Sequence, residues 1–146
     1  MGTTVVCLCI DYQENLLHIA HIGDSRIYLY RDGNLNQLTK DHSLINELID
    51  SGALNEKEAN HFANKAAVTK AVGVSADMKP DNKSLEYKKD DVILLVTDGL
   101  TNELEANEII EVIENHDDVF DISINLVDEA IDKGGRDNVT VTTIKI

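Results

Sequence analysis

A run of apolar residues that ends in an Asp-Gly pair decides the fold of this chain: Val92-Ile93-Leu94-Leu95-Val96-Thr97-Asp98-Gly99. The first five residues offer no polar face, so a strand made from them must be covered on both sides. We therefore predict a central strand that lies between a second layer of sheet and a layer of helices. The carboxylate of Asp98 would lie at the mouth of this strand, where an unpaired charge is costly unless a cation or hydrogen bonds compensate it.

Runs of apolar and β-branched residues on both sides of this strand predict further strands. They cover residues 4–11, 16–22, 26–30, 35–38, 84–87 and 138–146. Between the third and fourth of these runs stands Asp32-Gly33, a strong hairpin signal because both central positions of a type I′ turn need positive φ. We therefore assign Asp32 to a turn and do not count it as a ligand.

Helical periodicity interrupts the strands in two parts of the chain. In the first part, apolar residues recur at helical spacing over 44–49, and Asn55 with Glu58 predicts the capped start of a second short helix over 55–62. Such an excursion, at about 43–66, is typical of a flap or of a simple connector. In the second part, residues 106–115 and 121–133 predict two amphipathic helices, the latter ended by Gly134-Gly135.

The length and composition indicate one globular domain with a genuine core, since the chain has 146 residues of which 42% are apolar. Its formal charge of −14 argues against broad binding to nucleic acid or to an anionic membrane, because both require a positive surface. The acid is concentrated in residues 101–133, with 11 Asp and Glu against one Lys. This segment is either a solvated helical face or a docking surface for a basic partner.

The cysteines of the chain are Cys7 and Cys9, and their spacing in a strand puts both thiols on one face with poor geometry for a disulfide. We predict that they are reduced residues of the core. The apolar run around them, residues 5–10, is far too short to span a bilayer. These features favour a cytoplasmic protein, or part of one.

Three short motifs each place a carboxylate beside a glycine or an amide at the edge of a predicted strand. They are Gly23-Asp24-Ser25-Arg26, Thr97-Asp98-Gly99 and Gly135-Arg136-Asp137-Asn138. Strand ends can gather such oxygen ligands around a hard divalent cation. Each motif also has a plainer interpretation: an Asx turn or an ion pair with Arg26 for Asp24, and a simple turn for Asp98 and for Asp137.

The order of these motifs, with a flap-like insertion and two helices between them, resembles the catalytic domain of the metal-dependent protein serine/threonine phosphatases, the PPM or type 2C family, in its bacterial form. Supporting stretches are Met1-Gly2-Thr3-Thr4, Leu38-Thr39-Lys40-Asp41-His42-Ser43, Val68-Thr69-Lys70-Ala71-Val72-Gly73 and Asp90-Asp91-Val92-Ile93-Leu94-Leu95. The resemblance covers essentially the whole chain. It implies an α+β fold, a β-sandwich of two antiparallel sheets flanked by helices (α-β-β-α), N-terminally incomplete, with residues 1–146 as a single partial catalytic domain.

By this resemblance, two Mn²⁺ or Mg²⁺ ions hold a water that attacks the phosphorus of phosphoserine or phosphothreonine in phosphorylated proteins. Asp98 and Asp137 would hold one of these ions, and Asp24 with Asp98 would bind the third ion seen in bacterial members. Asn138 would orient its neighbour Asp137. The family's motifs also contain His21 and His42, which we expect to be structural.

The family residues that complete the site precede its Met-Gly-Thr-Thr segment, which here begins the chain. They are an arginine that grips the phosphate, an acidic residue, a histidine, and the metal-bridging Asp of an Asp-Gly-x-Gly segment. Neither Asp32-Gly33 nor Asp98-Gly99 continues in that way. We therefore expect no catalytic residue in this chain, weak or partial metal binding, and little or no activity of the chain alone.

Two functions remain open on the sequence. The first is the C-terminal part of a bacterial-type PPM phosphatase, and the alternative is a non-catalytic interaction module that retains the fold and binds a partner through its acidic face. Strands absent from both sheets would leave open edges, which tend to pair with another chain. We therefore expect a dimer or a domain-swapped form. The remaining histidines, His18, His61 and His116, are expected at the surface or at helix ends.

Overall fold

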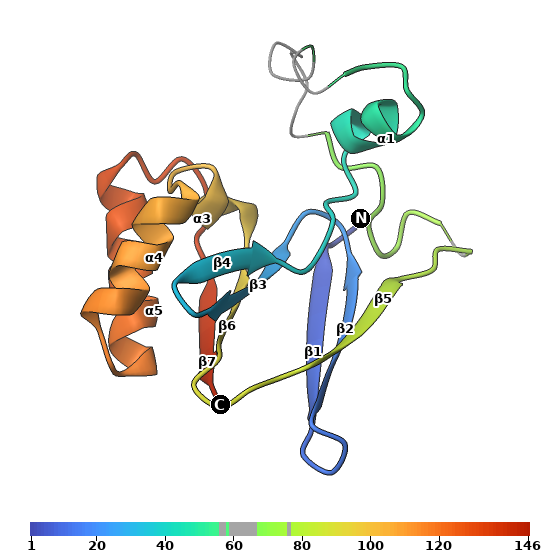
Figure 1. The fold of residues 1–146 in the computed structure, drawn as a ribbon. Coiled ribbons are helices and arrows are strands. Elements are labelled where there is room, and N and C mark those ends of the chain that lie inside the picture. Colours follow the sequence, from blue (N-terminus) through green and yellow to red (C-terminus); the bar gives the residue numbers. More distant parts are fainter. Residues whose placement is uncertain (56–57, 59–66, 76) are drawn as a thin grey trace.

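The computed structural model describes residues 1–55, 58, 67–75 and 77–146. Its strands and helices alternate in the order that Figure 1 shows. They are β1 (Val5–Asp11), β2 (Leu16–Ile22), β3 (Arg26–Arg31), β4 (Asn34–Gln37), α1 (Leu44–Asp50), β5 (Asp81–Glu86), β6 (Val92–Val96), α3 (Asp98–Thr101), α4 (Ala106–Asn115), α5 (Val119–Asp132) and β7 (Val141–Lys145).

The strands form two antiparallel sheets that face each other. One has the strand order β1-β2-β5 and the other the order β4-β3-β6-β7. Helices α3, α4 and α5 lie on the outer face of the second sheet (Figure 1). The predicted sandwich of two antiparallel sheets flanked by helices is therefore confirmed.

Strand β6 is buried on both faces, as its uninterrupted apolar sequence predicts. Ile93 packs into the core between the two sheets, and Leu94 packs into the core between the second sheet and the helices. Both side chains are 0% exposed, and burial of each stabilises the fold by roughly 1.5–3 kcal/mol. This strand holds the two cores together and ends at Val96, directly before the segment that carries Asp98.

Strand β1 corrects one expectation from the sequence. Its residues alternate between the two faces, so that Leu8 and Ile10 pack towards the core between the sheets whereas Cys7 and Cys9 are exposed. The thiols are free, as predicted, but they are not core residues. The reason is that this apolar run is covered on one face, in contrast to β6.

The hairpin between β3 and β4 confirms the assignment of Asp32 to a turn. Asp32 and Gly33 have φ angles of 52° and 76°, and they connect Arg31 directly to its cross-strand partner Asn34. Both residues thus have the positive φ that a type I′ turn requires.

Helix α1 forms the first part of the segment at about 43–66. It begins at Leu44, directly after the N-cap residue Ser43, whose side chain accepts a hydrogen bond from the Asn46 amide. Further on, the Asn55 amide donates to Glu58 Oε2 and the Glu58 amide donates to Asn55 Oδ1, each at 2.9 Å, which is the reciprocal cap that the sequence indicates. The rest of the second predicted helix, with His61, lies outside the described residues.

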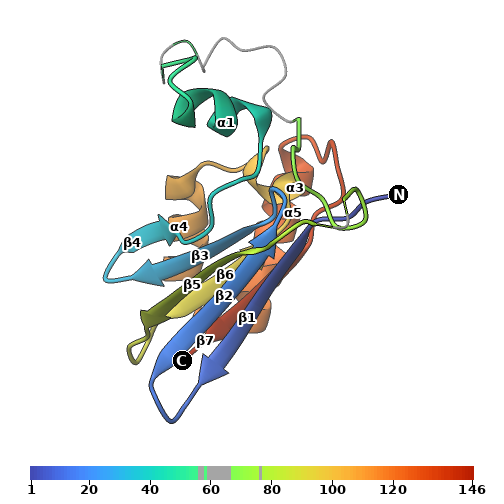
Figure 2. The same ribbon diagram turned by 90° about the vertical axis from the view of Figure 1, so that its right-hand side faces the viewer.

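Two edge strands, one from each sheet, lie at the same side of the sandwich. Figure 2 shows β1 and β7 at this side and β4 at the other. In the described part of the chain, β1 pairs with β2 alone and β7 with β6 alone, so each has one free edge.

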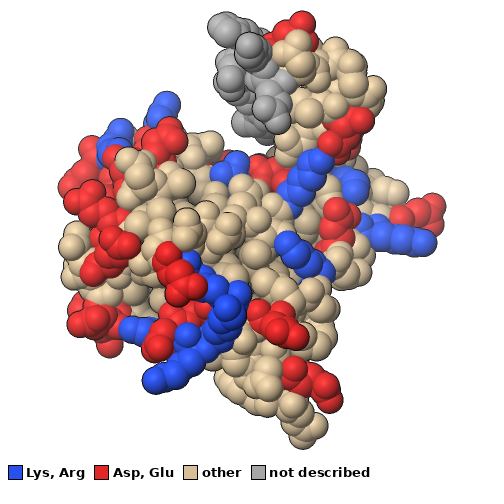
Figure 3. Space-filling view, viewed as in Figure 1, with Lys and Arg blue, Asp and Glu red and all other residues tan. Residues whose placement is uncertain are grey.

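Most acidic residues of 101–133 are exposed, and Figure 3 shows acidic side chains gathered over the helical side of the molecule. Among the described helices, none has the length and apolar character needed to cross a membrane.

Candidate functional site

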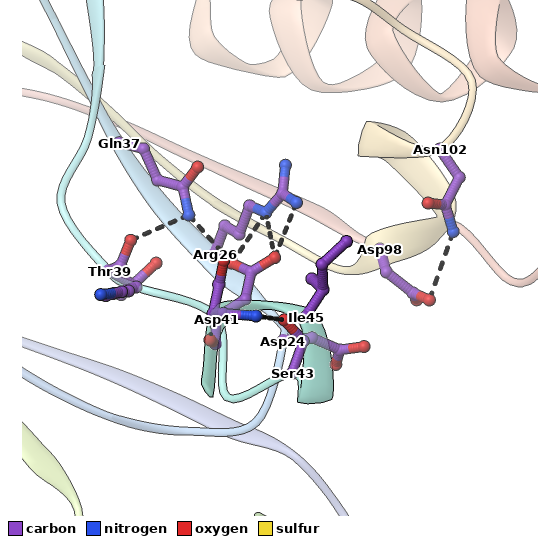
Figure 4. A pocket seen from close by; sticks show the side chains of 11 residues that line it. Asp24, Arg26, Gln37, Thr39, Asp41, Ser43, Ile45, Asp98 and Asn102 are labelled. Carbon is purple, nitrogen blue, oxygen red and sulfur yellow. Dashed lines mark hydrogen bonds and ion pairs between the residues drawn. The ribbon is translucent and has the colours of Figure 1, made fainter. Parts of the chain in front are cut away.

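A pocket of about 560 Å³ lies at the end of the sandwich where the β2–β3 connection, the β4–α1 connection and the start of α3 meet (Figure 4). Acidic, amide and hydroxyl side chains make up most of its lining. The lining residues are Asp24, Arg26, Gln37, Thr39, Lys40, Asp41, Ser43, Ile45, Asn46, Asp98 and Asn102.

Asp24 reaches this pocket from a tightly held turn. Gly23 has a φ of 110°, and a Cβ added there would lie 2.3 Å from the side chain of Thr4, so the turn needs a glycine to pack against the residue before β1. On the other side of Asp24, Ser25 is buried and its hydroxyl forms a 2.9 Å hydrogen bond with that of Thr4. These contacts fix the place of the Asp24 carboxylate.

Asp98 reaches the same pocket from the first turn of α3, a short helix that the sequence analysis did not predict. The Asn102 amide donates to Asp98 Oδ2 at 3.4 Å (Figure 4). Asn102 is therefore a site residue that sequence reasoning missed. Its spacing of four residues from Asp98 was the available signal, since such pairs face each other on a helix.

The carboxylates of Asp24 and Asp98 repel each other across the pocket. Burial and, after it, the charge of Asp98 raise the pKa of Asp24 above its ordinary value, although a backbone hydrogen bond partly offsets this. Arg26 does not relieve this repulsion by pairing with Asp24, because its guanidinium is bound to Asp41. The pocket thus presents negative charge that a divalent cation would stabilise.

Asp137 lies next to this pocket and not in it. It lines a second hollow with Gly99, Asn102, Glu103 and Arg136, so Asn102 borders both spaces. Its Oδ1 accepts a 2.7 Å hydrogen bond from the amide of Asn138, which is the self-capping turn that the plainer interpretation predicts. The structure thus brings Asp24 and Asp98 to one pocket and places Asp137 in the adjoining one.

The segments that carry Asp98 and Asp137 are joined by backbone contacts. The Thr97 amide donates to the Thr140 carbonyl at 3.1 Å, and the Thr140 amide donates to Thr97 Oγ1 at 3.0 Å. Gly99 packs so closely that a Cβ there would lie 2.3 Å from the carbonyl oxygen of Asn138. The loop before β7 is therefore seated directly on the start of α3.

A second group of ligand-type side chains lies apart from these aspartates. Ligand atoms of His21, His42 and Asp81 all lie within 4.8 Å of one another, and the two imidazole rings stack at 4.7 Å. His42 Nδ1 accepts a 3.0 Å hydrogen bond from the Gly23 amide, so the neutral ring carries its proton on Nε2, which lies 3.3 Å from Asp81 Oδ1.

This arrangement does not suit a metal ion. A metal at His42 Nε2 would need the opposite tautomer, in which an Nδ1 proton would face the Gly23 amide proton. His21 Nε2 donates to the Lys40 carbonyl at 2.9 Å. Both rings are buried and tie β2 to the loop before α1, which supports the structural role expected for His21 and His42.

Comparison with known proteins agrees with this architecture. The family model described as protein phosphatase 2C matches residues 1–48 and 55–139. The protein phosphatase PhpP of Streptococcus pneumoniae is 38% identical over 146 residues, which is 100% of this chain and 58% of that protein.

Solved structures give the same result. The S. agalactiae serine/threonine phosphatase superimposes with a TM-score of 0.92 and 35% identity, covering 100% of this chain and 60% of that one. The catalytic domain of the serine/threonine phosphatase PstP, solved with two manganese ions, has a TM-score of 0.83 and 34% identity, with 98% of this chain and 58% of that one covered. The chain thus spans about 58–60% of the length of these similar proteins, and it belongs to the protein phosphatase 2C family.

Proposed function

We propose that this chain is part of a bacterial-type protein serine/threonine phosphatase that hydrolyses phosphoserine and phosphothreonine in phosphorylated proteins with a metal-activated water. The observation that carries the proposal is the pair formed by Asp24 and Asp98, two carboxylates that share a pocket in which burial and the charge of Asp98 raise the pKa of Asp24. Membership of the protein phosphatase 2C family and the manganese complex of PstP support the same chemistry.

The residues present fit a divalent ion at this end of the sandwich. Asp24 and Asp98 supply hard oxygen ligands in a place where their charges are otherwise uncompensated, and Asp137 supplies a third carboxylate in the adjoining hollow. Bound Mn²⁺ or Mg²⁺ would supply a water of lowered pKa and would neutralise charge on the phosphoryl oxygens.

The remaining residues of the pocket position these ligands and border the space for substrate. Asn102 orients Asp98 through its side-chain amide, and Arg26 holds Asp41 and so keeps the pocket wall in place. Ile45 and Asn46 of α1 also line the pocket, along which the phosphorylated segment of a protein would pass. We assign no catalytic residue to this chain, because neither of its Asp-Gly pairs continues as the metal-bridging Asp-Gly-x-Gly.

Hydrolysis of p-nitrophenyl phosphate in the presence of Mn²⁺ tests this proposal. We expect little activity from this chain and full activity from the chain extended by its upstream reading frame. Asp98→Asn in the extended chain should abolish the activity. Substantial turnover by the 146-residue chain would contradict our account of the missing bridging ligand, and an extended chain without metal-dependent turnover would contradict the proposed function.

The free edges of β1 and β7 lead to a proposal about assembly. Each of these strands offers unpaired backbone donors and acceptors in the described residues, and such edges template pairing with another chain. We expect dimers or a domain-swapped form in solution. Sedimentation velocity checks this, and a monomer with an intact cooperative melt would contradict it.

The cytoplasm remains our expected compartment.

A further inference from the structure

The loop that carries Asp137 is anchored on its N-terminal side by a buried carboxylate. Glu103, just beyond α3, is 2% exposed in its side chain, whereas that of Arg136 is 75% exposed. The Glu103 carboxylate accepts hydrogen bonds from Arg136 Nε at 2.8 Å and from Arg136 Nη2 at 3.0 Å. The Arg136 backbone amide points to the same carboxylate at 3.4 Å. Arg136 is the residue before Asp137, so this pair restrains the backbone next to Asp137.

The same loop is anchored on its C-terminal side by the segment that carries Asp98. Thr97 Oγ1 donates to the carbonyl of Asn138 at 3.3 Å, and Gly99 packs against that carbonyl. Asp137 therefore lies between two anchors, Arg136 and Asn138, and both anchors attach to residues 97–103. Asp98 lies within that same stretch.

We infer that Glu103 and Arg136 are positioning residues that hold Asp137 at a fixed place beside Asp98, so that both carboxylates can serve one divalent ion. The inference rests on the proposed function, which assigns Asp98 and Asp137 as metal ligands. Neither Glu103 nor Arg136 contacts the ion in this scheme. Their effect passes through the backbone of the loop.

The chemistry of the pair suits this role. The planar guanidinium of Arg136 presents two parallel donors to the carboxylate, which fixes orientation as well as distance. Side-chain hydrogen bonds from Arg136 lower the pKa of Glu103, so the carboxylate stays ionised. A Cβ at Gly134, where φ is 151°, would approach Glu103 Oε2 to 3.2 Å, so the glycine leaves room for the pair formed by Glu103 and Arg136.

Binding of Mn²⁺ to the full 146-residue chain, followed by the electron paramagnetic resonance signal of free Mn²⁺, tests the inference. We expect Asp137→Asn to weaken Mn²⁺ binding. Arg136→Gln should raise the dissociation constant by about 10-fold, the usual scale for residues that orient a metal ligand. Arg136→Lys should restore part of the loss, and Arg136→Gln should have no further effect in the Asp137→Asn background.

A matched control is the pair between Arg31 and Asp91, which is also bidentate and makes no described contact with Glu103 or with the loop residues Arg136 to Asn138. Arg31→Gln should leave the dissociation constant unchanged. Circular dichroism melts of each variant show that the fold is retained, and a carboxyl NMR titration shows whether the pKa of Glu103 rises in Arg136→Gln.

The outcomes separate the two proposals. If Asp137→Asn weakens Mn²⁺ binding and a folded Arg136→Gln does not, the positioning role is overturned and the proposed function stands. If Arg136→Gln still weakens binding in the Asp137→Asn background, the pair does not act through Asp137 and the inference is also overturned. If Asp137→Asn itself has no effect, or the wild-type chain leaves all Mn²⁺ free, the ligand assignment fails and the inference fails with it.

Discussion

Arg26 grips both carboxylate oxygens of Asp41, with its Nη2 atom 2.7 Å from Oδ2 and its Nε atom 2.9 Å from Oδ1. Arg26 and Asp24 are near neighbours in sequence, yet the arginine turns to a residue of the β4–α1 connection. The pair leaves Asp24 and Asp98 as the uncompensated charges of the pocket. It thus divides the acidic side chains of the pocket into one that is structural and two that are available to a cation.

Removal of Arg26 should destabilise the fold. Arg26→Gln leaves Asp41, whose side chain is 13% exposed, without its cationic partner, so we expect a loss of about 2 kcal/mol in the free energy of unfolding. Urea denaturation measures the loss. Lys40→Gln is the matched control, because its pair with Asp50 is exposed at both ends and should contribute less than about 1 kcal/mol. Equal losses in the two variants would contradict the structural role of Arg26.

Asp98→Asn should have opposite effects without and with metal. In metal-free protein the substitution removes a like charge from beside Asp24, so the melting temperature should rise slightly and the pKa of Asp24 should fall. Added Mn²⁺ should raise the melting temperature of the wild-type chain and leave that of Asp98→Asn unchanged. A variant that responds to Mn²⁺ as the wild type does would remove Asp98 from the site.

The raised pKa of Asp24 gives a further pH-dependent prediction. Above the ordinary value of 3.8, the folded state retains a proton that the unfolded state has released, so the stability contributed by protonated Asp24 is present at low pH and is lost as the pH rises through the folded-state pKa. Asp24→Asn should therefore stabilise the metal-free chain at pH 7 and give no such gain below the ordinary value. Urea denaturation at both pH values in a chelator tests this, and an equal effect at both would contradict it.

His42 should have the opposite dependence on pH. Burial and then the charge of Lys70 lower its pKa below 6.5, while Asp81 acts in the other direction and the stacked His21 adds to the lowering. Between the folded-state pKa of His42 and 6.5, the unfolded chain therefore binds more protons than the folded chain. The stability that neutral His42 contributes is fully present above pH 6.5 and is lost as the pH falls through the folded-state pKa.

The ring resonances of His42 in an NMR titration should show this lowered midpoint. His42→Asn should reduce the acid sensitivity of the free energy of unfolding. A midpoint at or above 6.5 for His42 would contradict the lowering of its pKa by burial and by the charge of Lys70.

Gly99→Ala should disrupt the contact between α3 and the loop before β7. The added Cβ would lie 2.3 Å from the Asn138 carbonyl, which must move, so we expect a loss of about 2–3 kcal/mol. Gly52→Ala is a useful comparison, because nothing lies within 4 Å of the added Cβ and its φ of 74° alone should cost about 1 kcal/mol. A thermal melt of both variants ranks the two costs, and the reverse order would contradict the close approach at Gly99.

The sequence predicts those elements whose pattern is repeated over several residues. The bounds of β2, β6 and α4 agree with the prediction because alternation or helical spacing is unbroken there. Helix α3 is shorter than two helical turns, and so it leaves no periodic signal. The runs at 5–10 and 92–96 look alike, yet one is covered on one face and the other on both, because coverage depends on elements elsewhere in the chain.

The candidate site follows the same rule. Asp24 and Asp98 stand in recognisable motifs at strand ends, and the structure places them in one pocket. The pairs between Arg26 and Asp41 and between Glu103 and Arg136 join residues 15 and 33 positions apart. Which residues form such pairs depends on the paths of the loops in the folded chain. A local sequence pattern contains no information about these paths. The ligand roles of Asp24, Asp98 and Asp137 remain predictions.

The exposed thiols of Cys7 and Cys9 allow the accessibility of the outer face of the β1–β2–β5 sheet to be measured by thiol labelling. An alkylating reagent should modify both thiols in the folded chain, and air oxidation should cross-link separate molecules unless a reductant is present. Anything that covers this face, whether a further stretch of polypeptide or a second copy, would slow the labelling. The labelling rate of these thiols therefore reports whether the outer face of the β1–β2–β5 sheet is buried in a larger assembly.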